Sequence, residues 1–191
     1  MYNKEVFIIH GWGGSPKEPM HKWIKKELEN KGFKVVAPIM PNPDKPVISA
    51  WVNKIKDLVK TPDEDTYLIG HSIGCQAVLR YLEKLDSKIK VGKVILIAPW
   101  MYLDEKTIEE EGEESVRIAK PWVETPIDWS KIKKHTKDFN CIFSDNDPFV
   151  PVSNKKLFDK KLGAKIIVEH NKGHFDPDSG IKDLEVILKI I

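Results

Sequence analysis

The chain has 191 residues, of which 41% are apolar and 31% are charged, and its formal net charge is +2. We therefore expect residues 1–191 to fold as a single globular domain with a sizeable core. The near balance of charge gives no global field that would attract nucleic acid or a membrane surface, so neither partner is expected.

The two cysteines, Cys75 and Cys141, show no C-x-x-C spacing. Thiols without a disulfide framework or a metal-binding spacing favour a reduced, cytoplasmic protein. The first apolar run, residues 6–9, is too short for the core of a signal peptide or for a membrane span. We therefore expect neither in this sequence.

Short β-rich segments alternate with longer helical patterns along the chain. Strands are predicted at residues 6–10, 34–37, 66–70, 93–98, 138–144 and 165–169. Helices are predicted at residues 17–31, 46–59, 73–85, 130–135, 152–162 and 179–190. This alternation predicts an α/β fold with a parallel sheet and right-handed crossovers. Chemistry is then expected in the loops that follow the strands.

The first predicted strand runs into a glycine-rich loop, His10-Gly11-Trp12-Gly13-Gly14-Ser15. Glycines let the backbone approach a substrate closely, so the N–H of Trp12 is a candidate donor to an oxyanion. A phosphate-binding loop is the competing interpretation. It is disfavoured because both the Lys-Ser/Thr ending and the G-x-G-x-x-G spacing are absent.

The third predicted strand ends in Gly70-His71-Ser72-Ile73-Gly74, and a helical pattern follows at once. A G-x-S-x-G pattern between a strand and a helix predicts a nucleophile elbow with Ser72 at its tip. The serine needs a strained backbone there, and side chains at the glycine positions would collide with the neighbouring elements. Ile73 would offer its N–H to the oxyanion from the helix N-terminus.

After the fourth predicted strand, residues 99–129 form a connection about twice the usual length. Its acidic segment, residues 104–114, has two interpretations: a solvated surface helix, or a short flap over the active site. Trp100, Trp122 and Trp129 would line a pocket or anchor the flap. We include Trp100 and Trp122 among the candidate substrate-binding residues.

The last two strands are followed by candidates for an acid and a base. Asp145 and Asp147 follow the fifth strand, and His170 and His174 follow the sixth. A serine nucleophile needs a base oriented by a carboxylate, and this order along the chain fits. His174, in a Gly-His pair within a flexible loop, is favoured because His170 lies too close to the strand end.

The two histidines also have H-x-x-x-H spacing, but no helix or third ligand is indicated, so no metal site is predicted. Two further histidines, His10 and His71, border the loops of the expected site. Neither holds the position of the base. We expect these two side chains to be structural or to line the substrate pocket.

Together these motifs resemble the α/β-hydrolases. More narrowly, the chain resembles the small serine hydrolase family that includes bacterial YdeN-type proteins and the retinoblastoma-binding serine hydrolase. The matching segments are residues 10–15 with Trp23, residues 40–43 with Trp51, the elbow, residues 144–151 and Gly173-His174.

The resemblance implies a three-layer α/β/α sandwich, a reduced α/β-hydrolase fold with six parallel strands in the order 2-1-3-4-5-6. It places the nucleophile, acid and base on Ser72, Asp147 and His174. The acidic stretch at residues 109–114 has no match in the family pattern.

The function predicted is a cofactor-independent serine hydrolase that cleaves small carboxylic esters. One alternative is an aminoacyl-ester hydrolase or aminopeptidase-like enzyme, for which an acidic side chain would bind the substrate ammonium. The other is a non-catalytic protein-interaction module on a hydrolase scaffold. A small-molecule ester or aminoacyl substrate is expected, and a protein partner is possible but not indicated.

Overall fold

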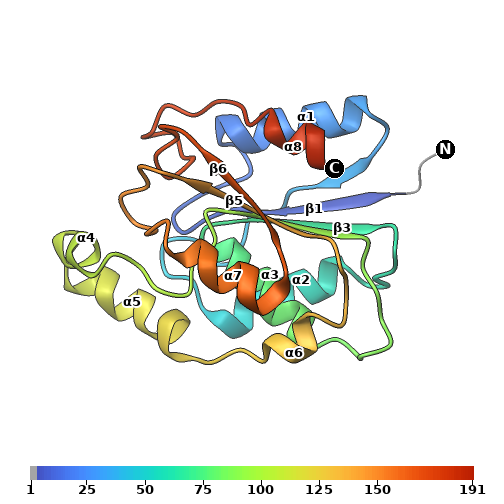
Figure 1. Cartoon of the computed structure of the whole chain (residues 1–191), viewed down its shortest axis with the longest axis horizontal. Helices are drawn as coiled ribbons and strands as arrows, with labels where there is room; N and C mark the ends of the chain where they lie inside the picture. Colours follow the sequence, from blue (N-terminus) through green and yellow to red (C-terminus); the bar gives the residue numbers. More distant parts are fainter. Residues whose placement is uncertain (1–3) are drawn as a thin grey trace.

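The computed structural model describes residues 4–191, which contain one six-stranded sheet (Figure 1). Its order is β2-β1-β3-β4-β5-β6, and every neighbouring pair is parallel. The predicted topology is therefore confirmed. The strands are β1 (Glu5–Ile9), β2 (Lys34–Val36), β3 (Thr66–His71), β4 (Lys93–Ile97), β5 (Phe139–Ser144) and β6 (Lys165–Glu169).

Helices cover both faces of this sheet. Two helices lie on one face, α1 (Pro19–Asn30) and α8 (Val186–Ile190) (Figure 1). The other face carries α2 (Ile48–Leu58), α3 (Ile73–Glu83), α6 (Trp129–Ile132) and α7 (Asn154–Leu162). The result is the expected α/β/α arrangement of three layers. Within residues 4–191, no helix combines the length and the apolar character needed to cross a bilayer.

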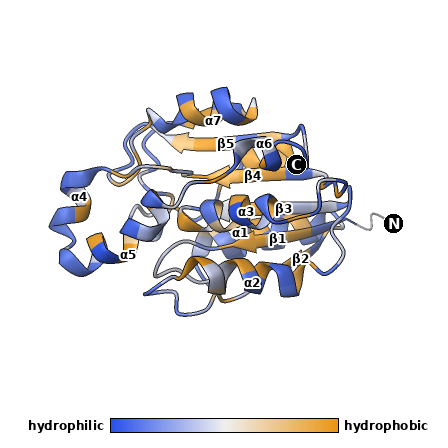
Figure 2. Ribbon diagram, turned by 90° about the horizontal axis from the view of Figure 1, so that it is seen from below, coloured by the Kyte–Doolittle hydropathy of each residue, from blue (hydrophilic) through white to orange (hydrophobic). Residues whose placement is uncertain are grey.

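The central strands are apolar because helices bury them on both sides. Every residue of β3 and of β5 is buried, whereas β6 at the sheet edge is partly exposed. Figure 2 shows apolar strands in the middle of the molecule and polar residues on the outer surfaces of the helices. One cluster of buried apolar side chains joins the sheet to both helical layers.

Two helices occupy the long connection after β4, namely α4 (Glu105–Glu110) and α5 (Glu113–Glu124). They extend past the carboxyl ends of the strands, away from the helices on the sheet faces (Figures 1 and 2). Asp104 caps α4 by accepting a hydrogen bond from the N–H of Thr107. Trp122 of α5 is fully buried and contacts Trp51 of α2 edge to face. The connection is thus anchored to the domain at its α5 end.

The last predicted helix begins later than residue 179, because only Val186–Ile190 is helical. The Asp176 carboxylate accepts hydrogen bonds from the N–H and the hydroxyl of Ser179 and closes a turn. Gly180 then has a φ of +73°. This polar turn chemistry overrides the helical pattern that the later residues show.

Candidate active site

Ser72 lies at a sharp turn between β3 and α3, as predicted for a nucleophile elbow. Its φ of 53° and ψ of −122° are unfavourable for a residue with a side chain. The turn is fixed on both sides, because the Ser72 N–H donates to the carbonyl of Ile97 and the Ser72 carbonyl accepts from the N–H of Cys75. The hydroxyl is thereby held above the carboxyl edge of the sheet.

The two glycines of the elbow are required by close backbone approach. A Cβ on Gly70 would lie 2.7 Å from the backbone of Cys75. A Cβ on Gly74 would lie 2.4 Å from the carbonyl oxygen of Ile9 in β1. Neither clash is with a flexible side chain, so no rotamer change relieves it. The helix can therefore pack onto the strands only with glycine at both positions.

A continuous chain of hydrogen-bonded side chains joins Asp147, His174 and Ser72. His174 Nδ1 is 2.8 Å from Asp147 Oδ2, and His174 Nε2 is 2.9 Å from Ser72 Oγ. The other carboxylate oxygen of Asp147 accepts hydrogen bonds from the N–H groups of Phe149 and Val150. The Asp147 side chain is only 2% exposed. A carboxylate held in this way fixes the imidazole with Nε2 toward the serine.

The remaining two candidates, Asp145 and His170, pair with each other. His170 Nδ1 contacts Asp145 Oδ2, and the other Asp145 oxygen accepts from the N–H of Asn171. That backbone hydrogen bond, followed by the one from His170, lowers the pKa of the Asp145 carboxyl. The His170 side chain is 80% exposed. This pair lies at the surface and takes no part in the hydrogen bonds to Ser72.

The loop that carries His174 is held by polar side chains that the sequence analysis did not single out. Asn146 Oδ1 accepts from the Gly173 N–H at 2.9 Å and from Ser144 Oγ at 2.8 Å. Ser179 Oγ accepts from the His174 N–H at 3.0 Å. The description of this loop as flexible therefore misses the hydrogen bonds that fix both sides of the histidine.

The two backbone N–H groups predicted to bind an oxyanion are both available. Around Trp12, the loop is folded by hydrogen bonds from the Gly13 N–H to the carbonyl of Pro43 and from the Gly14 N–H to the carbonyl of Gly11. Within residues 4–191, neither the Trp12 N–H nor the Ile73 N–H donates to a protein acceptor. A Cβ on Gly11 would lie 3.3 Å from Ser72 Cβ, so this loop passes close to the serine.

A cavity of about 590 Å³ opens at Ser72 and His174. Of the four candidate substrate-binding residues, His71 and Trp100 line it. Helices α4 and α5 and the segment before them also contribute to its wall. Their residues in the lining are Leu103, Ile108, Glu111, Glu114, Ser115 and Ile118. The connection after β4 therefore forms part of the pocket wall. Some residues of its acidic stretch line the cavity, and the others do not.

The other two candidates, His10 and Trp122, lie outside this lining and have structural contacts. His10 Nδ1 is 2.8 Å from the carbonyl of Gly11, and Nε2 accepts from the N–H of Met40. Burial is the main cause that lowers the pKa of His10, so the ring is neutral. Trp122 Nε1 donates to the carbonyl of Pro46. His10 thus joins two loops, Trp122 joins α5 to the loop before α2, and neither side chain lines the substrate pocket.

Comparison with known proteins gives a consistent result. A family model described as "Serine hydrolase" matches residues 6–191. The YdeN protein of Bacillus subtilis (strain 168) is 29% identical over 188 residues, covering 98% of this chain and 94% of that protein. Serine hydrolase RBBP9 of Rattus norvegicus is 30% identical over 167 residues, covering 87% of this chain and 78% of that protein.

Solved structures show the same fold. The crystal structure of the ydeN gene product superimposes with a TM-score of 0.87 at 29% identity, covering 98% of this chain and 96% of that chain. A structure from a study of carboxylesterases of Nitrososphaera gargenis has a TM-score of 0.73 at 14% identity, covering 98% of this chain and 89% of that chain. The second likeness concerns the fold alone.

Proposed function

Because the chain belongs to the serine hydrolase family, we propose that it cleaves small carboxylic esters through an acyl-enzyme on Ser72. The observation that carries the proposal is the unbroken hydrogen-bonded chain from Asp147 through His174 to Ser72. A serine hydroxyl is a weak nucleophile, and a base within hydrogen-bond reach with an oriented carboxylate behind it supplies the missing activation.

In the first half of the reaction, Ser72 Oγ attacks the ester carbonyl carbon while His174 Nε2 takes its proton. Asp147 stabilises the imidazolium that forms. The N–H groups of Trp12 and Ile73 are free to donate to the oxyanion of the tetrahedral intermediate. As that intermediate collapses, the C–O bond to the alcohol breaks and His174 returns the proton to the leaving oxygen.

In the second half, water replaces the alcohol. His174 takes a proton from the water, the hydroxide oxygen adds to the acyl carbon, and the bond to Ser72 Oγ breaks. The carboxylic acid leaves, and the serine recovers its proton from His174. These steps require no redox change and no cofactor, because His174 carries each proton between the serine, the leaving alcohol and water.

Labelling with a fluorophosphonate probe tests the proposal directly. The wild-type protein should bind the probe covalently, and Ser72→Ala should not. A matched control is Ser15→Ala, which changes a serine in the loop after β1 and should keep the label. Failure of the folded wild type to label, together with no hydrolysis of p-nitrophenyl acetate, would instead favour a non-catalytic interaction module.

A second candidate function, hydrolysis of aminoacyl esters, is favoured by the charge of the cavity wall. Six carboxylates line the cavity, and they come from Glu18, Asp44, Glu111, Glu114, Asp176 and Asp178. Lys45 is the cation among the lining residues, and its ammonium group is 2.8 Å from Glu114. A negatively charged cavity wall attracts a substrate that carries an ammonium group.

Matched substrates separate the two candidates. Free and N-acetylated alanine p-nitrophenyl esters have the same scissile bond and differ in charge. Aminoacyl specificity predicts a higher kcat/KM for the free ester and a loss of that preference at high salt, because salt screens the partly exposed carboxylates. Equal rates for both esters at low salt would leave simple ester hydrolysis as the function.

A further inference from the structure

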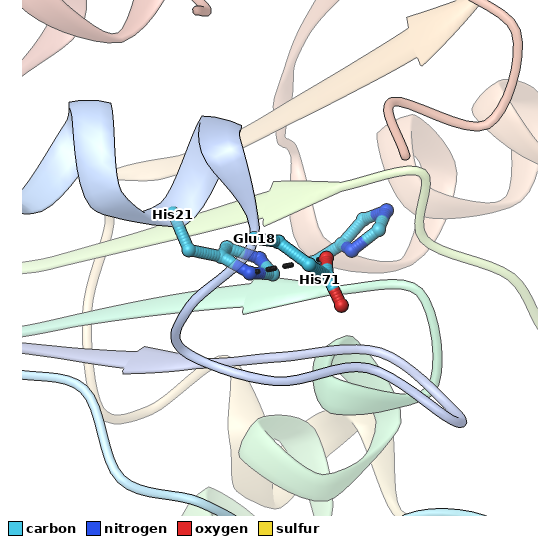
Figure 3. Close-up of side chains that lie close together, drawn as sticks. All are labelled: Glu18, His21 and His71. Atoms are coloured by element: carbon cyan, nitrogen blue, oxygen red, sulfur yellow. Dashed lines mark ion pairs between the residues drawn. The ribbon is translucent and has the colours of Figure 1, made fainter. Parts of the chain in front are cut away.

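A group of three side chains next to the elbow takes no part in the proton transfers of the proposed hydrolysis. It consists of Glu18, which precedes α1, His21 in the first turn of α1, and His71 at the end of β3 (Figure 3). One potential ligand atom from each lies within 4.8 Å of those of the other two. Loop, helix and strand thus bring a carboxylate and two imidazoles to one point.

His71 presents an unused lone pair in this group. Its Nε2 is 2.8 Å from the carbonyl oxygen of His174. Because a carbonyl can only accept, Nε2 carries the proton and Nδ1 is left as a bare acceptor. Nδ1 is buried and has no hydrogen-bond partner among the described residues. Burial also lowers the pKa of His71.

His21 is in a similar state. Its Nδ1 is 3.1 Å from the carbonyl of Ser15 and 3.3 Å from Glu18 Oε2, both of which are acceptors. The proton therefore lies on Nδ1, while the buried Nε2 has no partner in the part of the chain that the structure describes. Burial lowers the pKa of His21 to about 4. A buried nitrogen without a donor is costly, so two such atoms in one group need an explanation.

We propose that Glu18, His21 and His71 form a binding site for a divalent transition-metal ion of the zinc type. Two neutral imidazoles and a carboxylate are a ligand set that zinc accepts, with a fourth position left for water. A neutral imidazole can present either nitrogen by exchanging its tautomer, so His21 does not have to ionise. Glu18 and His71 also line the catalytic cavity, which gives the ion a route to the site.

We expect an ion bound at this site to inhibit ester hydrolysis. This part of the inference rests on the function proposed above. The ring of His71 is 5.3 Å from the ring of His174, centroid to centroid. His174 must become a cation when it takes the proton of Ser72. A divalent cation bound at His71 would repel the positive charge on His174, and this repulsion is weakly screened inside the protein. Zinc binding should therefore lower kcat.

Calorimetric titration of zinc chloride into the Ser72→Ala protein tests binding without catalysis. We expect one site whose affinity falls about tenfold or more in Ser72→Ala proteins that also carry Glu18→Gln or His21→Gln. His170→Gln is the matched control, because it removes an exposed histidine with an adjacent carboxylate and should leave the affinity unchanged. Visible absorption of the cobalt complex gives a second measurement, with a tetrahedral spectrum lost in the same variants.

Several outcomes would overturn the site. They are the absence of zinc binding, equal affinity in the Glu18→Gln variant, and loss of affinity in His170→Gln. Thermal unfolding without metal checks that each variant folds, and Glu18→Gln still decides the question if the buried His21→Gln does not. Zinc binding with no hydrolase activity in the wild type would instead retain the site and reject the proposed function.

Discussion

Two aspartate–histidine pairs come from the same two loops and differ in almost everything else. Asp147 and His174 are 2% and 12% exposed in their side chains, whereas Asp145 and His170 are 38% and 80% exposed. On the far side of its ring, His174 contacts the hydroxyl of Ser72, whereas His170 contacts only the side-chain amide of its neighbour Asn171. In the proposed mechanism, burial and a positioned nucleophile are what distinguish the Asp147–His174 pair from the exposed Asp145–His170 pair.

The buried pair is also the more constrained one. Asp147 accepts two backbone hydrogen bonds in addition to the imidazole, so its carboxylate cannot rotate away. Water competes for the hydrogen bond of the exposed pair and weakens its electrostatic contribution. Substitutions at matched positions of the two pairs should therefore lower kcat by amounts that differ by orders of magnitude.

The largest expected contrast is between the two histidines. His174→Gln removes the base and should lower kcat for ester hydrolysis about 10⁴- to 10⁶-fold, as expected for a member of a unit that acts together. His170→Gln should leave kcat within about twofold, because it changes an exposed surface side chain. Steady-state hydrolysis of p-nitrophenyl acetate measures both, and a comparable loss in the two variants would remove the distinction.

The two aspartates give the second contrast. Asp147→Asn keeps the shape of the side chain but favours the wrong imidazole tautomer, so kcat should fall about 10⁴-fold. Asp145→Asn should change kcat little, because Asp145 has no contact with His174 or Ser72. The same ester assay serves here, with thermal unfolding to show that both variants fold. A larger loss in Asp145→Asn would reverse the assignment of the acid.

The sheet order and the choice of Asp147 as the acid followed from the resemblance to the family, whereas the order of the motifs along the chain was sufficient to predict that a serine, an aspartate and a histidine would meet. The reason is physical: each motif is local, and parallel strands bring their carboxyl ends to one edge. The start of α8 was not predictable in the same way, because Asp176 and Ser179 form a turn within an apparently helical pattern.

Contacts between distant elements explain the other differences. No sequence pattern predicts the hydrogen bond from the Gly173 N–H to Asn146 that holds the His174 loop. An exposed asparagine in a turn usually hydrogen-bonds only to the backbone of that turn. The group of Glu18, His21 and His71 likewise depends on how α1 packs against the end of β3. Such contacts are set by tertiary packing, which local spacing does not encode.

Asn146→Ala tests whether the position of His174 also distinguishes the buried pair from the exposed one. It removes the acceptor for the Gly173 N–H and frees the loop that carries His174. A displacement of about 1 Å in a catalytic group lowers the rate by about 100-fold, so we expect a loss of about 10- to 100-fold in kcat with little change in KM. Asn146→Asp keeps the acceptor oxygen and should restore most of the rate.

The control for that experiment is Asn171→Ala, because the Asn171 side chain is hydrogen-bonded to His170 of the exposed pair and to no other side chain among residues 4–191. Its kcat should stay close to that of the wild type. If Asn146→Ala matched this control, or if Asn146→Asp failed to restore activity, the hydrogen bond to Gly173 would not be what positions the histidine.

The smallest expected effect concerns stability in acid. The folded-state pKa of Asp145 is lowered, chiefly by the hydrogen bond from the Asn171 N–H, so its charged form stabilises the fold. That contribution is present above the unfolded pKa of about 4 and is lost as the pH falls through the lower folded pKa. Asp145→Asn should therefore lower Tm by at most a few degrees at neutral pH and by less below about pH 3. Thermal unfolding across this range measures the difference, and an equal offset at every pH would show that the effect is not one of charge.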